Sequence, residues 1–102
     1  MSYLIQVLLP LYSGTGRPIS SRLLKRTAHE LTEKFGGLTA HTRAPVEGVW
    51  KKAGRRVKDD LLIYEVLSER LDRRWWKTYR ARLEQAFKQD KVQITVYTVQ
   101  QL

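Results

Sequence analysis

The stretch Leu61-Leu62-Ile63-Tyr64-Glu65-Val66-Leu67 decides the fold of this chain. It is a short apolar run rich in β-forming residues, with Asp59-Asp60 before it and Ser68-Glu69 after it. Such a run is typical of a central strand that is covered on both faces. Only Tyr3 to Leu11 is as apolar, so the sequence predicts two central strands with more polar elements around them.

Two amphipathic helices are expected next to these strands. Ser20 is placed to cap a helix that runs to about Phe35, where Gly36-Gly37 ends it with one glycine in the left-handed conformation. Asp72 is placed to cap the second helix. Residues at helical spacing predict the buried stripes. These are Leu24, Ala28, Leu31 and Phe35 in the first helix, and Trp76, Tyr79, Leu83, Ala86 and Phe87 in the second.

Two strands of mixed polarity complete the set, one over Leu38 to Ala44 before Pro45 and one over Lys91 to Val99. The order is then strand, helix, strand, strand, helix, strand. With right-handed crossovers it predicts a ferredoxin-like α+β sandwich, sheet order 4-1-3-2, with both helices on one face. The polarity agrees, because the two apolar strands take the centre of this order. We expect a single domain over residues 1–102.

The net charge of +9 is the strongest compositional signal. Excess positive charge favours polyanions and small anions as partners, and it also serves solubility. The absence of Cys excludes disulfides, thiolate metal ligands and a Cys nucleophile, and it fits a reducing cytoplasm. No signal-peptide pattern and no apolar run of the roughly 18 residues that a membrane helix needs are present. We therefore expect a cytoplasmic protein without a membrane partner.

The sheet face away from the helices is expected to be largely apolar. If the odd positions of the first strand face the helices, the opposite face carries the even ones, and the register that keeps Glu65 out of the core adds more apolar residues. Such a face is too apolar for water, and small sheets with a bare face pack back to back. We therefore predict a homodimer. Its interface residues are Leu4, Leu8, Leu61, Ile63 and Leu67.

No nucleophile, metal or cofactor motif is found, so we predict neither a metal nor a cofactor, and the sequence does not decide whether the chain is an enzyme. A Glu beside His or Arg is either a general base or part of a structural ion pair. The aromatic load predicts a pocket for a small anionic ligand between sheet and helices, with access near the second strand. A fully packed core is the alternative. The candidate ligand residues are His41, Arg43, Trp50, Tyr64 and Glu65.

Residues Lys51 to Lys58 are expected to form a basic hairpin, since five of these eight residues are Lys or Arg. The alternative function is thus a non-enzymatic module that binds an acidic partner, or nucleic-acid phosphates weakly and without sequence preference. Sequence-specific reading of RNA is not expected, because it needs exposed aromatics on the two central strands. The expected polyanion contacts are Lys51, Lys52, Arg55 and Arg56.

The chain carries three further marks: the runs Leu31 to Thr39 and Arg43 to Trp50, and the pair Trp75-Trp76 followed by Tyr79. With these marks, residues 31–102 resemble a group of small uncharacterised bacterial proteins of the dimeric α+β-barrel type of ferredoxin-like domain. The resemblance implies the fold and brings no activity and no catalytic residues.

Overall fold

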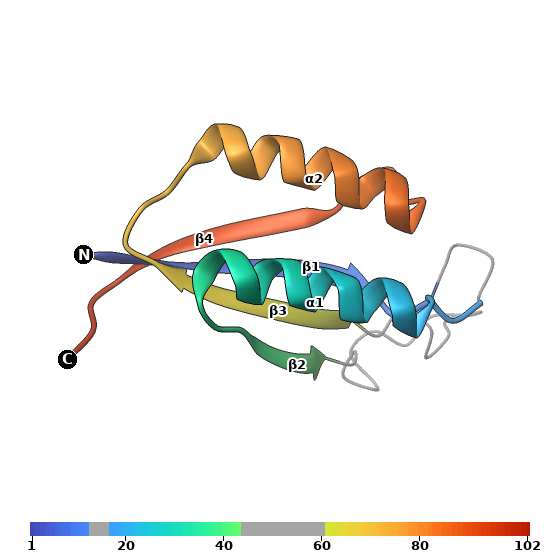
Figure 1. The fold of residues 1–102 in the computed structure, drawn as a ribbon, viewed down its shortest axis with the longest axis horizontal. Coiled ribbons are helices and arrows are strands. Elements are labelled where there is room, and N and C mark those ends of the chain that lie inside the picture. The colour runs from blue at the N-terminus through green and yellow to red at the C-terminus, as the bar shows by residue number, and fades with distance from the viewer. Residues whose placement is uncertain (13–16, 44–60) are drawn as a thin grey trace, which may run out of the picture.

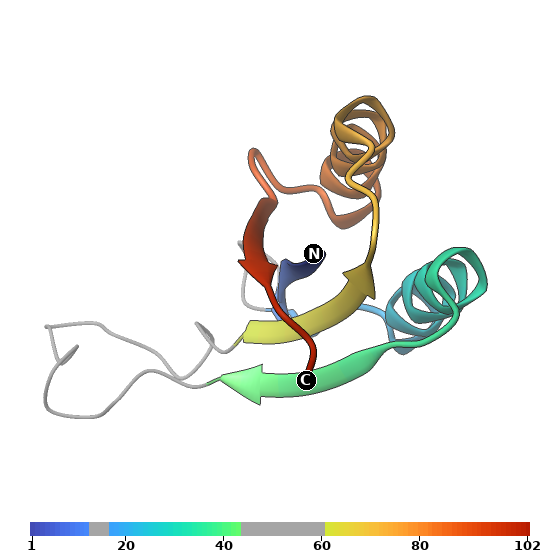
Figure 2. The ribbon, with the colours of Figure 1, turned by 90° about the vertical axis from the view of Figure 1, so that its left-hand side faces the viewer.

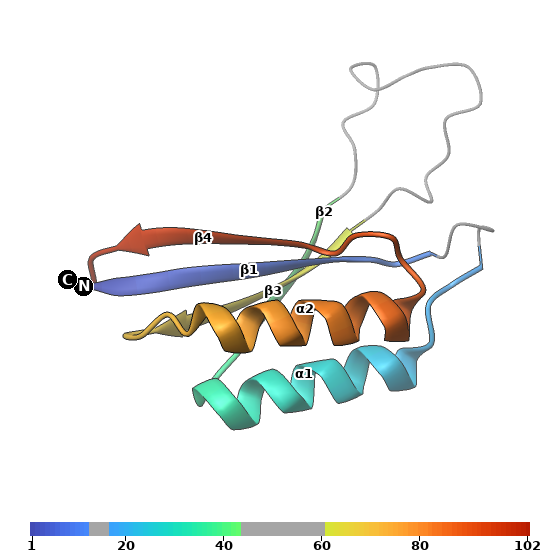
Figure 3. The same cartoon turned by 90° about the horizontal axis from the view of Figure 1, so that it is seen from above.

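The computed structural model describes residues 1–12, 17–43 and 61–102, and Figure 1 shows the order of its elements. They are β1 (Ser2–Pro10), α1 (Ser21–Phe35), β2 (Thr39–Arg43), β3 (Leu61–Ser68), α2 (Arg73–Phe87) and β4 (Gln93–Val99). The strands form one antiparallel sheet in the order β2-β3-β1-β4, which is the predicted order read from its other edge. Figure 2 shows β2 and β4 at the two edges, and Figure 3 shows both helices on one side of the sheet. The predicted fold class is confirmed.

The hydrophobic core lies between the sheet and the helices. Ile5, Val7 and Leu9 have no exposed surface, so the odd positions of β1 face the helices as predicted. Full burial of one such side chain stabilises the fold by about 1.5–3 kcal/mol. The core comprises Ile5, Val7, Leu9, Leu31, Tyr64, Val66, Trp76, Tyr79, Leu83, Phe87 and Val92.

Both predicted helix caps are present. The Ser20 hydroxyl accepts a hydrogen bond from the Leu23 N–H at 3.4 Å, and the Asp72 carboxylate accepts one from the Trp75 N–H at 3.0 Å. At the end of α1, Gly36 has φ 80°, the left-handed conformation expected of one of the two glycines. At the end of α2 the non-glycine Lys88 takes this conformation, which the sequence did not indicate.

Two positions differ from the predicted helix stripes. Ala86 is exposed, whereas Thr27, a polar residue, is almost fully buried. Thr27 tolerates burial because its hydroxyl donates to the Leu23 carbonyl at 2.9 Å within the helix. The start of β4 also differs: it begins at Gln93, since the Val92 N–H donates to the Glu84 carboxylate at 3.0 Å instead of joining the sheet.

An aromatic cluster joins the two helices. The Phe35 ring of α1 stacks on Trp76 of α2 with centroids 5.3 Å apart, and Trp75 stacks on Tyr79 at 4.7 Å. The Lys34 ammonium lies 4.6 Å from the Trp75 ring centroid. Each aromatic pair adds about 0.5–1.5 kcal/mol beyond its buried area. The interpretation of these aromatics as core residues therefore holds for the described part of the chain.

Neither described helix combines the length and the apolar character that a bilayer-spanning helix requires.

Candidate functional site

A row of polar side chains crosses the open face, by which we mean the sheet face that the helices leave uncovered. Gln6 of β1 lies opposite Glu65 of β3 and Thr95 of β4, and Glu65 lies opposite Thr39 of β2. Directly opposed residues of neighbouring strands share a face. The register thus gathers polar residues from each strand of the sheet into one line.

Hydrogen bonds connect this row into a network. The Gln6 amide donates to the Glu65 carboxylate, and the Thr95 hydroxyl donates to the Gln6 amide oxygen at 3.3 Å. The His41 Nε2 lies 3.3 Å from the same Glu65 carboxylate. We call His41, Glu65, Gln6 and Thr95 the open-face network. Glu65 is its only carboxylate.

The network keeps Glu65 ionised. The hydrogen bond from Gln6, and then His41, lower the pKa of the Glu65 carboxyl below its usual value, against the opposite effect of burial. The side chain of Glu65 is 19% exposed and that of His41 is 45% exposed, so a ligand in solvent can reach both. At neutral pH Glu65 therefore places a fixed negative charge on the open face.

Apolar side chains border the network on both sides. Leu8 and Ile63 are paired on one side, and on the other Leu4 is opposite both Leu67 and Tyr97. Leu67 is 41% exposed and Tyr97 is 52% exposed. Ile63 lies on the predicted face but has no exposed surface, so it cannot itself offer contact area to another molecule without a rearrangement. The homodimer interface stays a prediction.

The five candidate ligand residues do not form one site. His41 and Glu65 meet on the open face, whereas the Tyr64 hydroxyl donates to the Leu24 carbonyl of α1 at 2.9 Å on the helix side of the sheet. The backbone of Arg43 pairs opposite Leu61 at the end of β2. The remaining candidates lie outside the described residues. They are Trp50 and the polyanion-contact residues Lys51, Lys52, Arg55 and Arg56.

A second candidate site is a groove between α2 and the edge strand β4, with a volume of about 280 Å³. Because β4 has no neighbour on its outer side, the layer between helix and sheet is open there. Val96 shows this directly: it is opposite the buried Ile5, on the helix side, and is still 41% exposed. We call this the α2–β4 groove. It is lined by Leu71, Arg73, Trp76, Lys77, Arg80, Ile94 and Val96.

The groove combines an apolar floor with a cationic rim. Arg73, Lys77 and Arg80 recur at positions i, i+4 and i+7 of α2, so they share one side of the helix. Arg80 makes a long ion pair with Glu84 at 3.9 Å, while Arg73 and Lys77 have no ion pair within the part of the chain that the structure describes. The sequence did not predict a groove at this edge of the sheet, and of the lining residues it indicated only Trp76, as part of the buried stripe of the second helix.

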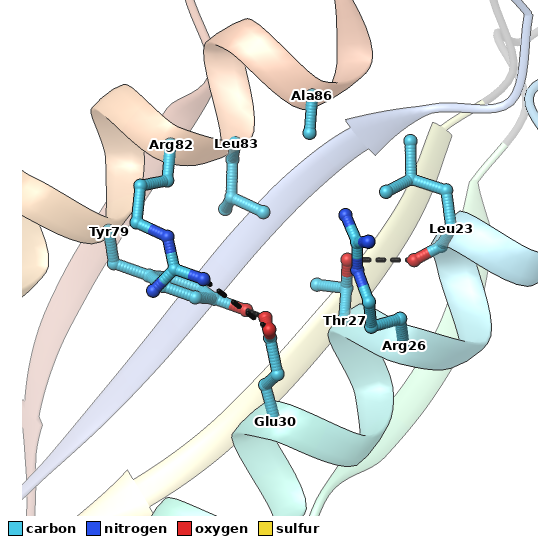
Figure 4. Close-up of a pocket in the computed structure, with 8 residues that line it drawn as sticks. All are labelled: Leu23, Arg26, Thr27, Glu30, Tyr79, Arg82, Leu83 and Ala86. Carbon is cyan, nitrogen blue, oxygen red and sulfur yellow. Dashed lines mark hydrogen bonds and ion pairs between the residues drawn. The ribbon is translucent and has the colours of Figure 1, made fainter.

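A smaller cleft of about 50 Å³ lies between α1 and α2. In Figure 4 the side chains of Tyr79 and Arg82 both point at Glu30. The Tyr79 hydroxyl donates to one carboxylate oxygen at 2.9 Å, and Arg82 lies 3.5 Å from the other. Burial, followed by the contact with Glu30, strongly raises the pKa of Tyr79. The cleft has room for water only, and its polar groups satisfy one another, so we regard it as structural.

In residues 1–12, 17–43 and 61–102, no three His, Asp or Glu side chains lie close enough together to hold a metal ion.

Comparison with known proteins supports the fold. No protein-family model matches the chain, and no curated protein matches its sequence. The structure is similar to that of a phage SAM lyase solved in complex with S-methyl-5′-thioadenosine. The TM-score is 0.56 with 13% sequence identity, over 94% of this chain and 80% of that one. At this identity the similarity concerns the fold alone.

Proposed function

We propose that the protein binds a small anionic ligand in the α2–β4 groove, with an apolar part of the ligand against the floor. The observation that carries this proposal is the exposure of Val96 on the helix side of the sheet, next to Arg73 and Lys77, which have no ion pair within the described residues. Ligand sites are concave and mainly apolar, with a few polar groups that fix the orientation of the ligand. The smallest have a volume of about 300 Å³. The groove has this character and nearly this size.

The cationic rim of the groove favours a ligand with a negative charge. A carboxylate or phosphate can accept bidentate hydrogen bonds from Arg73 or Arg80 and a further one from Lys77. Hydrogen bonds to charged groups contribute about 1.5–3 kcal/mol when shielded, and exposed ion pairs about 0.2–1 kcal/mol. Since the rim is exposed, the lower range applies, and we expect modest affinity.

The structural neighbour suggests a suitable shape of ligand. That lyase holds S-methyl-5′-thioadenosine, a nucleoside derivative with a planar base. A planar base fits against Trp76, Ile94 and Val96, and a phosphate attached to the sugar would reach the rim. AMP is therefore a suitable probe, with adenosine as its uncharged counterpart.

The test is an NMR titration of the labelled protein with each probe at low ionic strength. AMP is expected to shift the Ile94 and Val96 amides and the Trp76 indole, with adenosine binding more weakly. Replacing Arg73 and Lys77 by Ala should weaken AMP binding by about twofold to thirtyfold, which corresponds to about 0.2–1 kcal/mol for each cation. The control is Arg22→Ala with Lys25→Ala, which removes two exposed cations from α1.

Any of three outcomes would contradict the proposal. They are no shift of the groove residues with either probe, equal binding of AMP and adenosine, and a loss of affinity in the α1 control as large as that in the groove variant. This last result would indicate a general effect of net charge.

The groove lies between the sheet and a helix, as in the sequence hypothesis, but that hypothesis placed the entrance near the second strand, whereas β4 is at the opposite edge of the sheet. Within the described residues the groove is formed by α2 and β4, and none of His41, Tyr64 and Glu65 lines it.

A further inference from the structure

We infer that the open face carries a separate site, which binds a small organic cation such as a quaternary ammonium group against the Glu65 carboxylate. This site differs from the α2–β4 groove in its position on the sheet and in its charge. The inference rests on the open-face network and its apolar borders.

The charge of Glu65 favours a cation as the ligand of the open face. Among the described strand residues, Glu65 is the only acidic one and Arg43 is the only Lys or Arg. Arg43 is at the end of β2 opposite Leu61, four positions along β3 from Glu65, which is about 13 Å at the rise of a strand. The ionisable partner of Glu65 within these residues is His41, and a histidine loses its positive charge within the physiological pH range. With His41 neutral, no ion pair within the described residues balances this carboxylate.

The positive charge of α2 does not cancel this local field. The cations of α2 lie on the helix side, and at physiological ionic strength exposed charges beyond about 8 Å are largely screened. A carboxylate among apolar side chains is screened less. A cation that comes close to Glu65 therefore experiences mainly this one charge.

The borders of the network determine the type of cation. A strongly hydrated ion such as Na⁺ gains nothing from Leu4 and Leu67, which lie next to the network on the open face. A trimethylammonium group is weakly hydrated and carries apolar methyl groups, so it can contact these leucines while facing Glu65. Tyr97, half exposed and opposite Leu4, offers an aromatic ring for a longer substituent.

The competing occupant is a second copy of the chain, as in the predicted homodimer. A two-fold contact centred on the network would bring two ionised Glu65 side chains into one buried interface, where like charges are unfavourable. The fixed charge thus favours a cationic ligand over a self-complementary contact.

The experiment compares choline with 3,3-dimethyl-1-butanol, in which a carbon replaces the charged nitrogen. Both are titrated into the labelled wild-type protein in the millimolar range while the Gln6 side-chain amide and the backbone amides of Glu65 and Leu67 are followed. Choline is expected to shift these signals and the neutral compound is not. Glu65→Gln should weaken choline binding at least tenfold, and Glu33→Gln, the same change at an exposed position of α1, should leave it unchanged.

Equal shifts from the two probes would overturn the inference, because charge would then play no part. Absence of choline shifts at the network would also overturn it. Light scattering on the same samples identifies the reason in that case: a 24 kDa particle, about twice the 12.0 kDa chain, would indicate that a second copy covers the face. The wild-type comparison needs no variant, so it stays decisive even if Glu65→Gln folds poorly.

Discussion

The contact between Tyr79 and Glu30 is the interaction between helices whose removal has the most predictable cost. Tyr79 is 2% exposed, and its hydroxyl donates to Glu30 at 2.9 Å. Tyr79→Phe deletes this hydroxyl while keeping the ring that stacks on Trp75. The change therefore isolates one hydrogen bond to a charged acceptor.

The cost of removing this hydrogen bond depends on the surroundings of the Glu30 carboxylate, which accepts it. Hydrogen bonds to charged groups contribute about 1.5–3 kcal/mol. Glu30 is one-third exposed and keeps its contact with Arg82, so water can replace part of the lost interaction. We expect Tyr79→Phe to lower the free energy of unfolding by about 1.5 kcal/mol, and the melting midpoint by about 5–10 °C.

Urea unfolding followed by tryptophan fluorescence measures this cost. Tyr97→Phe is the control, because Tyr97 is half exposed and no hydrogen bond of its hydroxyl is found among the described residues; it should cost less than about 0.5 kcal/mol. If both variants cost the same, the Tyr79–Glu30 hydrogen bond does not stabilise the fold. A double-mutant cycle with Glu30→Ala, which removes the acceptor, should give a coupling of about 1 kcal/mol, and additive costs would refute the contact.

Other predictions concern a helix end, the network and the net charge. Gly36→Ala should cost about 1 kcal/mol in a thermal unfolding assay, because Gly36 has φ 80° and open space around it, while Gly37→Ala, without a positive φ, should be neutral. The depressed pKa of Glu65 means that its contribution is present above the usual glutamate pKa and is lost as the pH falls through the folded value; the stability gap between wild type and Glu65→Gln should close in acid. Binding to unrelated RNA and DNA oligonucleotides should be weak and fall steeply with salt; tight, salt-resistant binding to one sequence would contradict this.

Most of the fold could be predicted because its signals are local. Ser20, Asp72 and Gly36 mark helix ends through their own hydrogen bonds or conformation, and the two apolar strands stand out by composition. The errors have two causes. Val92 leaves the sheet because its N–H donates to Glu84, eight residues away. Thr27 can be buried although it is polar, because its hydroxyl donates to a carbonyl within the helix.

The candidate sites were harder to predict, because they depend on register and on the sheet edge. His41 and Glu65 could be named from their residue types, but their meeting on one face requires the pairing of β2 with β3. Gln6 and Thr95 are polar residues at alternating positions, a signal that becomes specific only when β1 is known to lie between β3 and β4. The α2–β4 groove depends on how far a helix overhangs an edge strand, which residue spacing does not give.

Strand β4 contributes residues to both proposed sites. Its side chains alternate between the two faces of the sheet, so a substitution in β4 can affect one site and not the other. Ile94 and Val96 of β4 line the groove, while Thr95, between them, belongs to the open-face network. Successive side chains of a strand point to opposite faces, so neighbouring positions report on different sites.

Val96→Glu places a carboxylate on the groove floor, where it repels the phosphate of AMP, and should abolish the AMP response while leaving the choline response in place. Thr95→Val removes the hydrogen bond to Gln6 with little change of volume and should weaken choline binding without affecting AMP. Two NMR titrations of each variant measure this crossed pattern. If either variant reduced both responses equally, the two ligands would share one site or the variant would disturb the whole sheet, and the independence of the two faces would have to be abandoned.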